Sequence, residues 1–341
     1  GHRVLSARDE DVSVAGTIDL SGGAGRDGGN LTINGRLIDL TGSADLTGRA
    51  GGQARLTSDV LVLTGRLDAS GLTGGSIDLL TRSALVSGEA DAVGLDGAGG
   101  SIRLVADGNL LQTAGGRIDA SGVSGGSIYV TAGGSFFSSG QMSATGSGGV
   151  GGRITVGGGA VSLIGALADA SGAAGGGVIS IGDDRTGALL GPAESVRVSG
   201  TTYIRADATV SGNGGDIRLW SATATGVSGN LSARGAGAGS GGFIEISSNG
   251  EAGFNGAADL SGPDGLDPGD LLEDGPLGFG DIGDLVEGPH VLDLADLGFE
   301  LGQHGYWQGV CSHKDTPHAR RAGPAAFHAV HSFTRPRGAH P

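Results

Sequence analysis

Apolar and polar residues alternate in short segments that recur along most of this chain. The clearest copy spans Gly115–Gly134 and reads GGRIDASGVSGGSIYVTAGG. In its second half, Ile128 and Val130 alternate with polar neighbours, and this period of two predicts a strand with one buried face. The segment Asp119-Ala-Ser-Gly122 predicts a turn, because Asp can bond its own downstream backbone and Gly accepts a positive φ.

The same pattern can be counted along the chain. A glycine pair, one residue and then apolar-x-apolar begins at residues 28, 51, 74, 99, 125, 151, 176, 214 and 241, with spacings of 23, 23, 25, 26, 26, 25, 38 and 27 residues. The predicted inward-facing pairs are Leu31/Ile33, Ala54/Leu56, Ile77/Leu79, Ile102/Leu104, Ile128/Val130, Ile154/Val156, Ile179/Ile181, Ile217/Leu219 and Ile244/Ile246.

Units of this length with such short strands cannot bury a core one at a time, but they can if successive units stack. We therefore expect an all-β fold, a right-handed parallel β-helix of about ten coils, in which each coil pairs in parallel with its neighbours. A leucine-rich repeat has a similar period, but it needs a fixed Leu spacing and an Asn or Cys in each repeat. Helical repeats conflict with the frequent glycine, which costs a helix about 1 kcal/mol per position.

Composition and charge agree with an elongated protein that works outside the cell. The chain has 74 Gly in 341 residues and a formal charge of −15, and it lacks the basic surface that would bind nucleic acid. Its single cysteine, Cys311, excludes a disulfide framework. No apolar run approaches about 18 residues, so we expect no transmembrane segment. The chain opens Gly1-His2-Arg3 without a leader, and we expect it to be a piece of a longer protein.

The pattern also divides the chain into regions. Residues 1–11 form a polar lead-in, and residues 12–262 hold the β-helix, with a loop inserted at about 182–195 where the period stretches. Residues 263–341 contain eight of the nine Pro and seven of the eight His. Because Pro removes ladder donors, we expect Pro263 and Pro268 to end the stack. The acidic and then His-, Arg- and Pro-rich tail is predicted to be poorly ordered and largely disordered.

Residues 175–272 carry a resemblance to a known family. The run GGGVISIGDDRTG is followed by SGTTYIRADATVSGNGGDIRLWS, GNLSARGAGAGSGGFIEISSNG, FNGAADLSGPDG and DLLED. In this order the segments resemble the repeat region of filamentous haemagglutinin-like large exoproteins, the secreted adhesins of two-partner secretion systems. The units at residues 65–182 resemble the same region less specifically, and the whole match covers roughly residues 12–275.

The resemblance implies a function and a partner. It implies a structural stem segment of a secreted or cell-surface adhesin, exported by an outer-membrane two-partner secretion transporter. The stem would present contact sites to glycans or proteins of a host or neighbouring cell. Two features depart from the family: its amino-terminal secretion domain is missing, and the tail replaces its usual continuation after the DLLED segment.

A ladder of aspartates heads the turns, and it allows two interpretations. Parallel stacking would place these carboxylates about 4.8 Å apart, where like charges repel by roughly 0.9 kcal/mol per pair even in water. Bonds from turn N–H groups could offset that repulsion, and so could Ca²⁺ bridging between coils, as in a calcium-dependent surface-layer repeat protein. The ladder comprises Asp19, Asp45, Asp68, Asp91, Asp119, Asp169 and Asp259.

Two further residue groups invite a chemical role. Asp183 and Asp184, with His304 as a partner, suggest the alternative of a β-helical carbohydrate-active enzyme, a polysaccharide hydrolase or lyase. Glycoside hydrolysis needs two carboxyl groups held across the bond, whereas adjacent strand residues face opposite sides. The second group has metal-ligand residue types, but its spacing fits no closed site: Cys311, His313, His318, His328 and His331. We therefore predict no enzyme activity, no catalytic or metal-binding residues and no cofactor.

Overall fold

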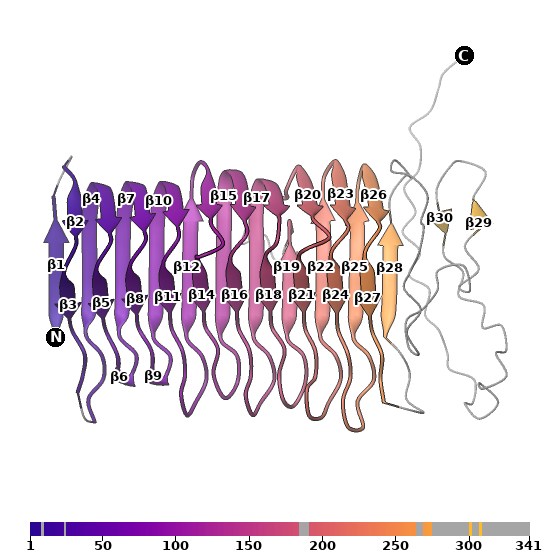
Figure 1. Cartoon of the computed structure of the whole chain (residues 1–341), viewed down its shortest axis with the longest axis horizontal. Coiled ribbons are helices and arrows are strands. Elements are labelled where there is room, and N and C mark those ends of the chain that lie inside the picture. The colour runs from indigo at the N-terminus through magenta and orange to yellow at the C-terminus, as the bar shows by residue number, and fades with distance from the viewer. Residues whose placement is uncertain are drawn as a thin grey trace, which may run out of the picture.

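The chain folds into a long parallel β-solenoid. The computed structural model describes residues 1–7, 10–23, 25–183, 191–263 and 269–274, and the strand residues 300–301 and 307–308. All regular elements in these residues are strands. They form a 16-stranded sheet and a 10-stranded sheet whose strands stack along the rod (Figure 1). The all-β prediction of about ten stacked coils is therefore confirmed.

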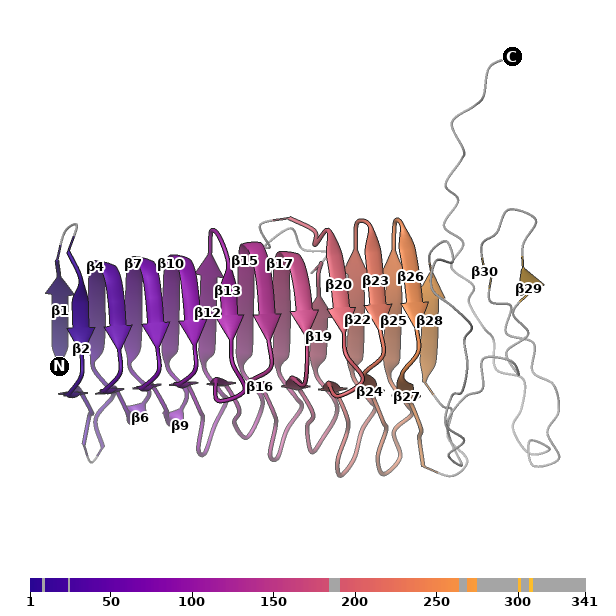
Figure 2. The same ribbon diagram turned by 45° about the horizontal axis from the view of Figure 1, so that its top comes forward.

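Each coil of the solenoid contributes strands to three faces. The first face and the second face belong to the 16-stranded sheet, and several long strands run from the first into the second (Figure 2). The long strands are β4 (Asn30–Leu40), β7 (Gln53–Leu63), β10 (Ser76–Val86), β15 (Ser127–Ser138) and β17 (Arg153–Leu163). The first face also contains six shorter strands, and the long strands pair with the first three of them: β1 (His2–Ser6), β12 (Ser101–Ala106), β19 (Val178–Ile181), β22 (Asp216–Ser221), β25 (Phe243–Ser248) and β28 (Asp270–Asp274).

Shorter strands complete the second and third faces. The second face adds β2 (Val12–Val14), β13 (Leu110–Gln112), β20 (Ser195–Val198), β23 (Ala224–Val227) and β26 (Glu251–Phe254). The third face is the 10-stranded sheet, made of β3 (Thr17–Asp19), β5 (Ser43–Asp45), β8 (Arg66–Asp68), β11 (Glu89–Asp91), β14 (Arg117–Asp119), β16 (Gln141–Ser143), β18 (Leu167–Asp169), β21 (Tyr203–Arg205), β24 (Asn230–Ser232) and β27 (Ala257–Asp259). Two small sheets remain, β6 (Gly48–Ala50) with β9 (Gly71–Thr73), and β29 (Glu300–Leu301) with β30 (Trp307–Gln308).

The core is built by residues that stack directly over their equivalents. Ile102 pairs with Ile128 and Ile128 with Ile154, in parallel and in register. All eighteen predicted inward-facing residues are buried, with at most 3% of their surface exposed. Burying one such aliphatic side chain is worth about 1.5–3 kcal/mol, so the stacked columns account for the cohesion of neighbouring coils.

The glycine pairs lie where two coils approach most closely. A Cβ on Gly99 would lie 1.9 Å from the carbonyl oxygen of Ala120, and one on Gly51 would lie 1.8 Å from that of Ala69. No side chain fits at such distances. The repeated glycine pair is therefore required by backbone contact between coils, just before each first-face strand begins.

The solenoid extends beyond both predicted ends. The polar lead-in contains β1, which pairs with β4 and places Leu5 beside Ile33. At the other end β28 pairs with β25 after Pro263, so the stack does not stop at residue 262. The second glycine of the repeat motif is still present there: Gly269 donates its N–H to the Leu260 carbonyl, as Gly242 does to the Ala233 carbonyl one coil earlier. Both strands carry only fragments of the repeat, which is why the motif count missed them.

The predicted loop and tail fall largely outside the described residues. The structure describes the loop's flanks: Gly182 has a φ of +89°, and Ala193 is fully buried before β20 begins. Residues 184–190 lie outside the description. So does most of the tail, and the predictions of an inserted loop and of disorder after residue 274 stay predictions.

Candidate functional site

The aspartate ladder forms one continuous column on the third face. Asp19, Asp45, Asp68, Asp91 and Asp119 are paired in consecutive strands, in register. The column then continues through Ser143, Asp169, Arg205, Ser232 and Asp259. The structure thus brings all seven predicted aspartates into one row.

Most of these carboxylates accept a hydrogen bond from their own turn. Asp119 Oδ1 accepts the backbone N–H of Ser121 at 2.8 Å, and Asp19 additionally accepts the Ser21 hydroxyl at 2.7 Å. The hydroxyl and the N–H of Ser21 lower the pKa of the Asp19 carboxyl below its ordinary value. The own-turn N–H bonds join Ser21 to Asp19, Thr47 to Asp45, Ser70 to Asp68, Ser121 to Asp119, Ser171 to Asp169 and Ser261 to Asp259.

The other four coils take the equivalent acceptor from the preceding coil. Thr145 follows Ser143 rather than an aspartate, and its N–H donates to Ser121 Oγ at 3.1 Å. The same inter-coil bond joins the N–H of Val93 to Ser70 Oγ, that of Asp207 to Ser171 Oγ and that of Arg234 to Asp207 Oδ1. The N–H two residues after the ladder position is therefore satisfied in all ten coils.

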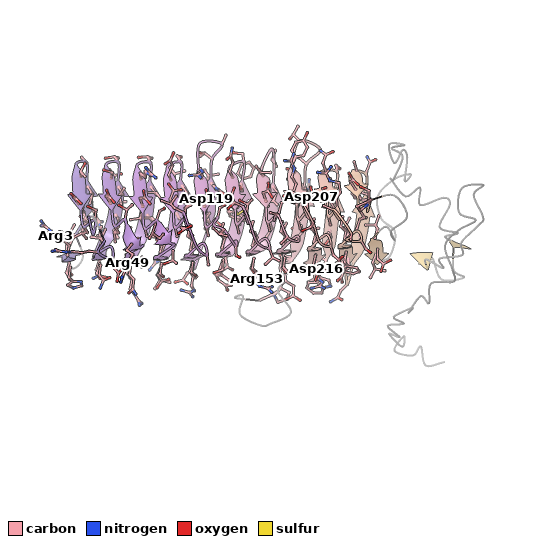
Figure 3. The ribbon with its side chains drawn as sticks, turned by 90° about the horizontal axis from the view of Figure 1, so that it is seen from below. Arg3, Arg49, Asp119, Arg153, Asp207 and Asp216 are labelled. Atoms are coloured by element: carbon pink, nitrogen blue, oxygen red, sulfur yellow. The ribbon has the colours of Figure 1, made fainter. Side chains whose placement is uncertain are left out.

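The irregular coil near Asp207 keeps this pattern of N–H bonds, although its aspartate lies two residues after the ladder position instead of at it. Arg205 takes the ladder position, and Asp207 takes the position where seven of the other nine coils have Ser or Thr. Asp207, labelled in Figure 3, is buried, and it accepts the Ser232 hydroxyl at 2.5 Å and Arg234 Nη2 at 3.0 Å. The carboxylate thus serves the next coil instead of its own.

Asp91 lies at the centre of the densest group of charges. Its side chain is 2% exposed and lies between two arginines, with Arg117 Nη1 at 2.7 Å and Arg66 Nη2 at 3.0 Å. Arg117 also pairs with Asp119, and Arg66 pairs with Asp68 at 2.8 Å. Burial raises the pKa of the Asp91 carboxyl above its ordinary value, and the two guanidinium groups oppose that shift.

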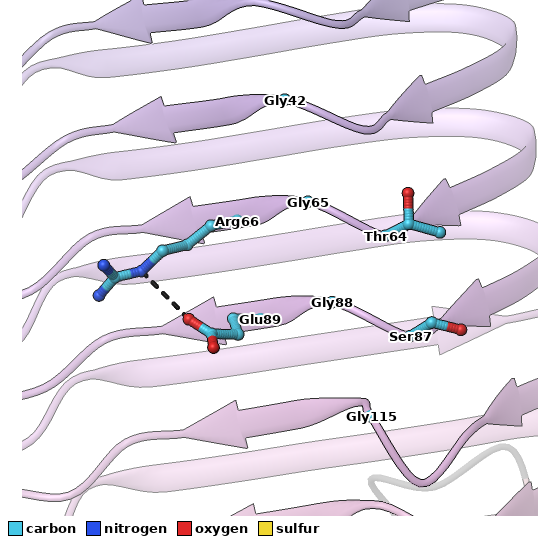
Figure 4. Close-up of a pocket in the computed structure, with 8 residues that line it drawn as sticks. All are labelled: Gly42, Thr64, Gly65, Arg66, Ser87, Gly88, Glu89 and Gly115. Carbon is cyan, nitrogen blue, oxygen red and sulfur yellow. Dashed lines mark ion pairs between the residues drawn. The ribbon is translucent and has the colours of Figure 1, made fainter.

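A shallow hollow lies beside these charges but offers little chemistry. Figure 4 shows it bordered by the backbone at Gly42, Gly65 and Gly88, with Arg66 and Glu89 forming an ion pair at 3.4 Å. The pair is open to solvent, where such contacts are worth about 0–1 kcal/mol. The carboxylate oxygens nearby already accept bonds from arginines and turn N–H groups. The ladder and its surroundings therefore hold coils together.

The outward row of the first face carries a second set of charges. Asp78 lies between Arg55, at 3.9 Å, and Arg103, at 3.1 Å, so the charges alternate across three consecutive coils. The Arg103 guanidinium also lies over the Tyr129 ring, 5.7 Å from its centre. Further along the row, three residues are buried although they lie between the inward-facing positions: Thr155, Ser180 and Glu245.

The residues with a predicted catalytic or metal-binding alternative are mostly not described. Asp183 follows β19 directly after Gly182, but Asp184 and His304 lie outside the described residues. The same holds for Cys311, His313, His318, His328 and His331. Among the residues that the structure does describe, no group of three or more His, Cys, Asp or Glu side chains is placed to hold a metal ion.

Sequence reasoning found the aspartates but missed the bonds that cross between coils. The signal was present: each coil that lacks the Asp-x-Ser/Thr pair follows a coil with Ser, or with Asp207, at the third turn position. Only parallel stacking makes that relation meaningful, because the donor and acceptor are 23 to 36 residues apart in sequence.

Comparisons with known proteins do not assign this chain to a family. No family model matches this chain, and no curated protein matches it. Among solved structures, the chain is similar to the crystal structure of the HMW1 secretion domain from Haemophilus influenzae. The TM-score is 0.40 at 15% sequence identity, and the match covers 80% of this chain and 95% of that chain.

Proposed function

We propose that this chain is a non-enzymatic stem segment of a secreted or cell-surface adhesin, which presents contact sites away from the cell. The observation that carries the proposal is the unbroken stack of parallel coils from β1 to β28. Nine steps between ten third-face strands, at about 4.8 Å each, give a rod of roughly 43 Å. The buried aspartates of its third face accept bonds from arginines and turn N–H groups of the same and neighbouring coils.

The proposed export route and partners rest on the resemblance of residues 175–272 to two-partner secretion exoproteins. The partner for export would be an outer-membrane transporter, and the contacts would be glycans or proteins on a host or neighbouring cell. No helix in the described part of the chain is long and apolar enough to cross a membrane. Weak contacts repeated along such rods would combine through effective concentration.

The test shortens the rod without disturbing its register. Deleting residues 77–153 from the gene of the producing cell joins Ser76 to Ile154. This removes three whole coils, because Ser76 and Arg153 occupy the same position in coils three steps apart. The control refills the gap with a copy of residues 31–101, three coils in the same phase. A stem predicts that both variants are secreted, that adhesion to target cells falls with the deletion, and that the copied coils restore it.

Three results would contradict the proposal. Adhesion that does not change with rod length would exclude a role in reach. Turnover of an acidic polysaccharide that disappears in an Asp183→Ala/Asp184→Ala variant would establish the enzyme alternative instead. A melting temperature that depends on millimolar Ca²⁺ would favour the calcium-dependent surface-layer alternative.

A further inference from the structure

The second face carries an apolar stripe on its outer side. Inward residues such as Leu110 and Phe136 are buried in the core, but their neighbours Leu111 and Phe137 point outward. Leu111 and Val60 each expose 41% of their surface. The stripe consists of Val60, Val62, Leu85, Leu111 and Phe137, and these residues line a shallow groove of about 510 Å³.

Opposite charges lie at the two ends of this stripe. Strand pairing places Val62, Leu85, Leu111 and Phe137 in one row across four consecutive coils. On one side of these four residues the row passes through Asp39, beside Val62, to Ser13; on the other it passes from Phe137 through Ser162 to Arg197 and then to two glycines. From Asp39 to Arg197 the row therefore contains an acidic residue, four apolar residues, a serine and a basic residue.

The two end charges differ from two charged pairs that lie beside the long strands of this face. Asp59 pairs with Arg82 at 3.5 Å, and Arg36 pairs with Asp11 at 2.9 Å. For Asp39 and Arg197 the structure gives no ion pair among the described residues. They are thus available to charges on a second molecule.

We propose that this stripe binds a second copy of the chain, with the two rods antiparallel. A two-fold axis along β13 would superpose the row on its own reverse, so that Leu111 meets Leu111 and Leu85 meets Phe137 of the second copy. Asp39 then meets Arg197 of the second copy, twice in the dimer. A parallel arrangement would instead place Asp39 against Asp39, which is repulsive. Charge complementarity therefore selects the antiparallel dimer.

The proposed contact is small. Six coil-to-coil steps of about 4.8 Å make the row roughly 29 Å long, and the two outward rows lie about 7 Å apart. Stable interfaces bury about 800 Å² on each partner, more than this stripe offers. We therefore expect a weak, concentration-dependent dimer, which becomes significant when many copies are held on one surface.

The test is sedimentation equilibrium of the full chain over a wide concentration range, combined with a charge swap. Asp39→Arg and Arg197→Asp should each weaken dimerisation about tenfold, because two attractions become two repulsions. The Asp39→Arg/Arg197→Asp double variant should restore it, since the pairs re-form with signs exchanged. Arg153→Asp makes the same charge change as Arg197→Asp on the exposed first face (Figure 3), and it should leave dimerisation unchanged.

Circular dichroism of each variant keeps the result interpretable, because these exposed substitutions should preserve the β-sheet signal. A monomer at all concentrations would overturn the proposal. So would a double variant that stays as weak as the single ones, or an Arg153→Asp variant that loses association equally.

Discussion

Phe136 and Phe137 are adjacent in β15, yet they belong to different parts of the molecule. Phe136 is fully buried in the core column with Leu110 and Val161, whereas Phe137 lies in the outer stripe. Both columns are apolar and extend over several coils, but only the inner column packs in the core. The difference teaches that repetition of apolar residues builds the solenoid on its inner side, and leaves the outer side for contacts with other molecules.

The largest effect should come from the contact between backbones inside the rod. In Gly99→Ala the new Cβ would lie 1.9 Å from the Ala120 oxygen, so the two coils must separate. We expect the variant to lose more than about 4 kcal/mol and to yield little soluble protein, an exceptionally large cost for one substitution. The control is Gly226→Ala, whose Cβ has nothing within 4 Å and which should be neutral or slightly stabilising. Equal melting curves for the two variants would contradict the account of the glycine pairs.

The two phenylalanines provide the next comparison. Phe136→Ala should lower the free energy of unfolding by about 3–5 kcal/mol, because it leaves a cavity in the stacked core. Phe137→Ala should cost less than about 1 kcal/mol and should instead weaken self-association. Urea denaturation measures the first effect and sedimentation the second. The distinction between inner and outer columns fails if Phe137→Ala is as destabilising as Phe136→Ala.

Removing a buried carboxylate should also cost more stability than removing an exposed one, but the difference should be smaller than for the two phenylalanines. Asp119→Ala removes the acceptor of the Ser121 N–H and leaves Arg117 without one partner, and we expect a loss of about 1–3 kcal/mol. Asp216 pairs with Arg218 at 3.1 Å but is 41% exposed, so Asp216→Ala should cost about 0–1 kcal/mol. Similar losses in the two variants would show that the turn bonds contribute nothing beyond an ordinary surface ion pair.

The smallest effect is a dependence of stability on pH at Asp91. Burial raises the pKa of this carboxyl, so the folded state holds the proton more tightly than the unfolded state does. Its contribution to stability therefore falls as pH rises above about 3.8, the ordinary value for Asp. Relative to the wild type, Asp91→Asn should gain stability as pH rises through that window. A relative loss over the same window would mean that the arginines dominate and the pKa is lowered.

The sequence was most informative where side-chain type alone determines the burial. The alternation of Ile128 and Val130 with polar residues predicted which side faces the core, and the repeat predicted the parallel register. The outer stripe could not be found in this way, because runs such as Val60–Leu63 and Phe136–Phe137 are apolar on both sides of the strand. In such runs the sequence does not show which residues face the core. Only the bend of the chain from the first to the second face determines the side on which each residue lies.

On the third face, the sequence likewise predicted the hydrogen bonds within a turn but not those between coils. The Asp-x-Ser/Thr turns were predictable because donor and acceptor are two residues apart. The bond from the Thr145 N–H to Ser121 crosses between coils, and it depends on how exactly the two turns superpose. The exchange at Arg205 and Asp207 is likewise an irregularity in sequence but preserves the bonding pattern in space.

Parallel stacking in this register is tested most directly by a disulfide between adjacent coils. Ser127 Oγ donates to Ser101 Oγ at 3.2 Å, and Ser76 lies one coil further along the same row. In a Cys311→Ser background, Ser101→Cys/Ser127→Cys should form an intramolecular disulfide under mild oxidation. Ser76→Cys/Ser127→Cys, two coils or about 9.6 Å apart, should not. A disulfide in the second pair and none in the first would contradict the stacked arrangement on which the stem and its outer surface depend.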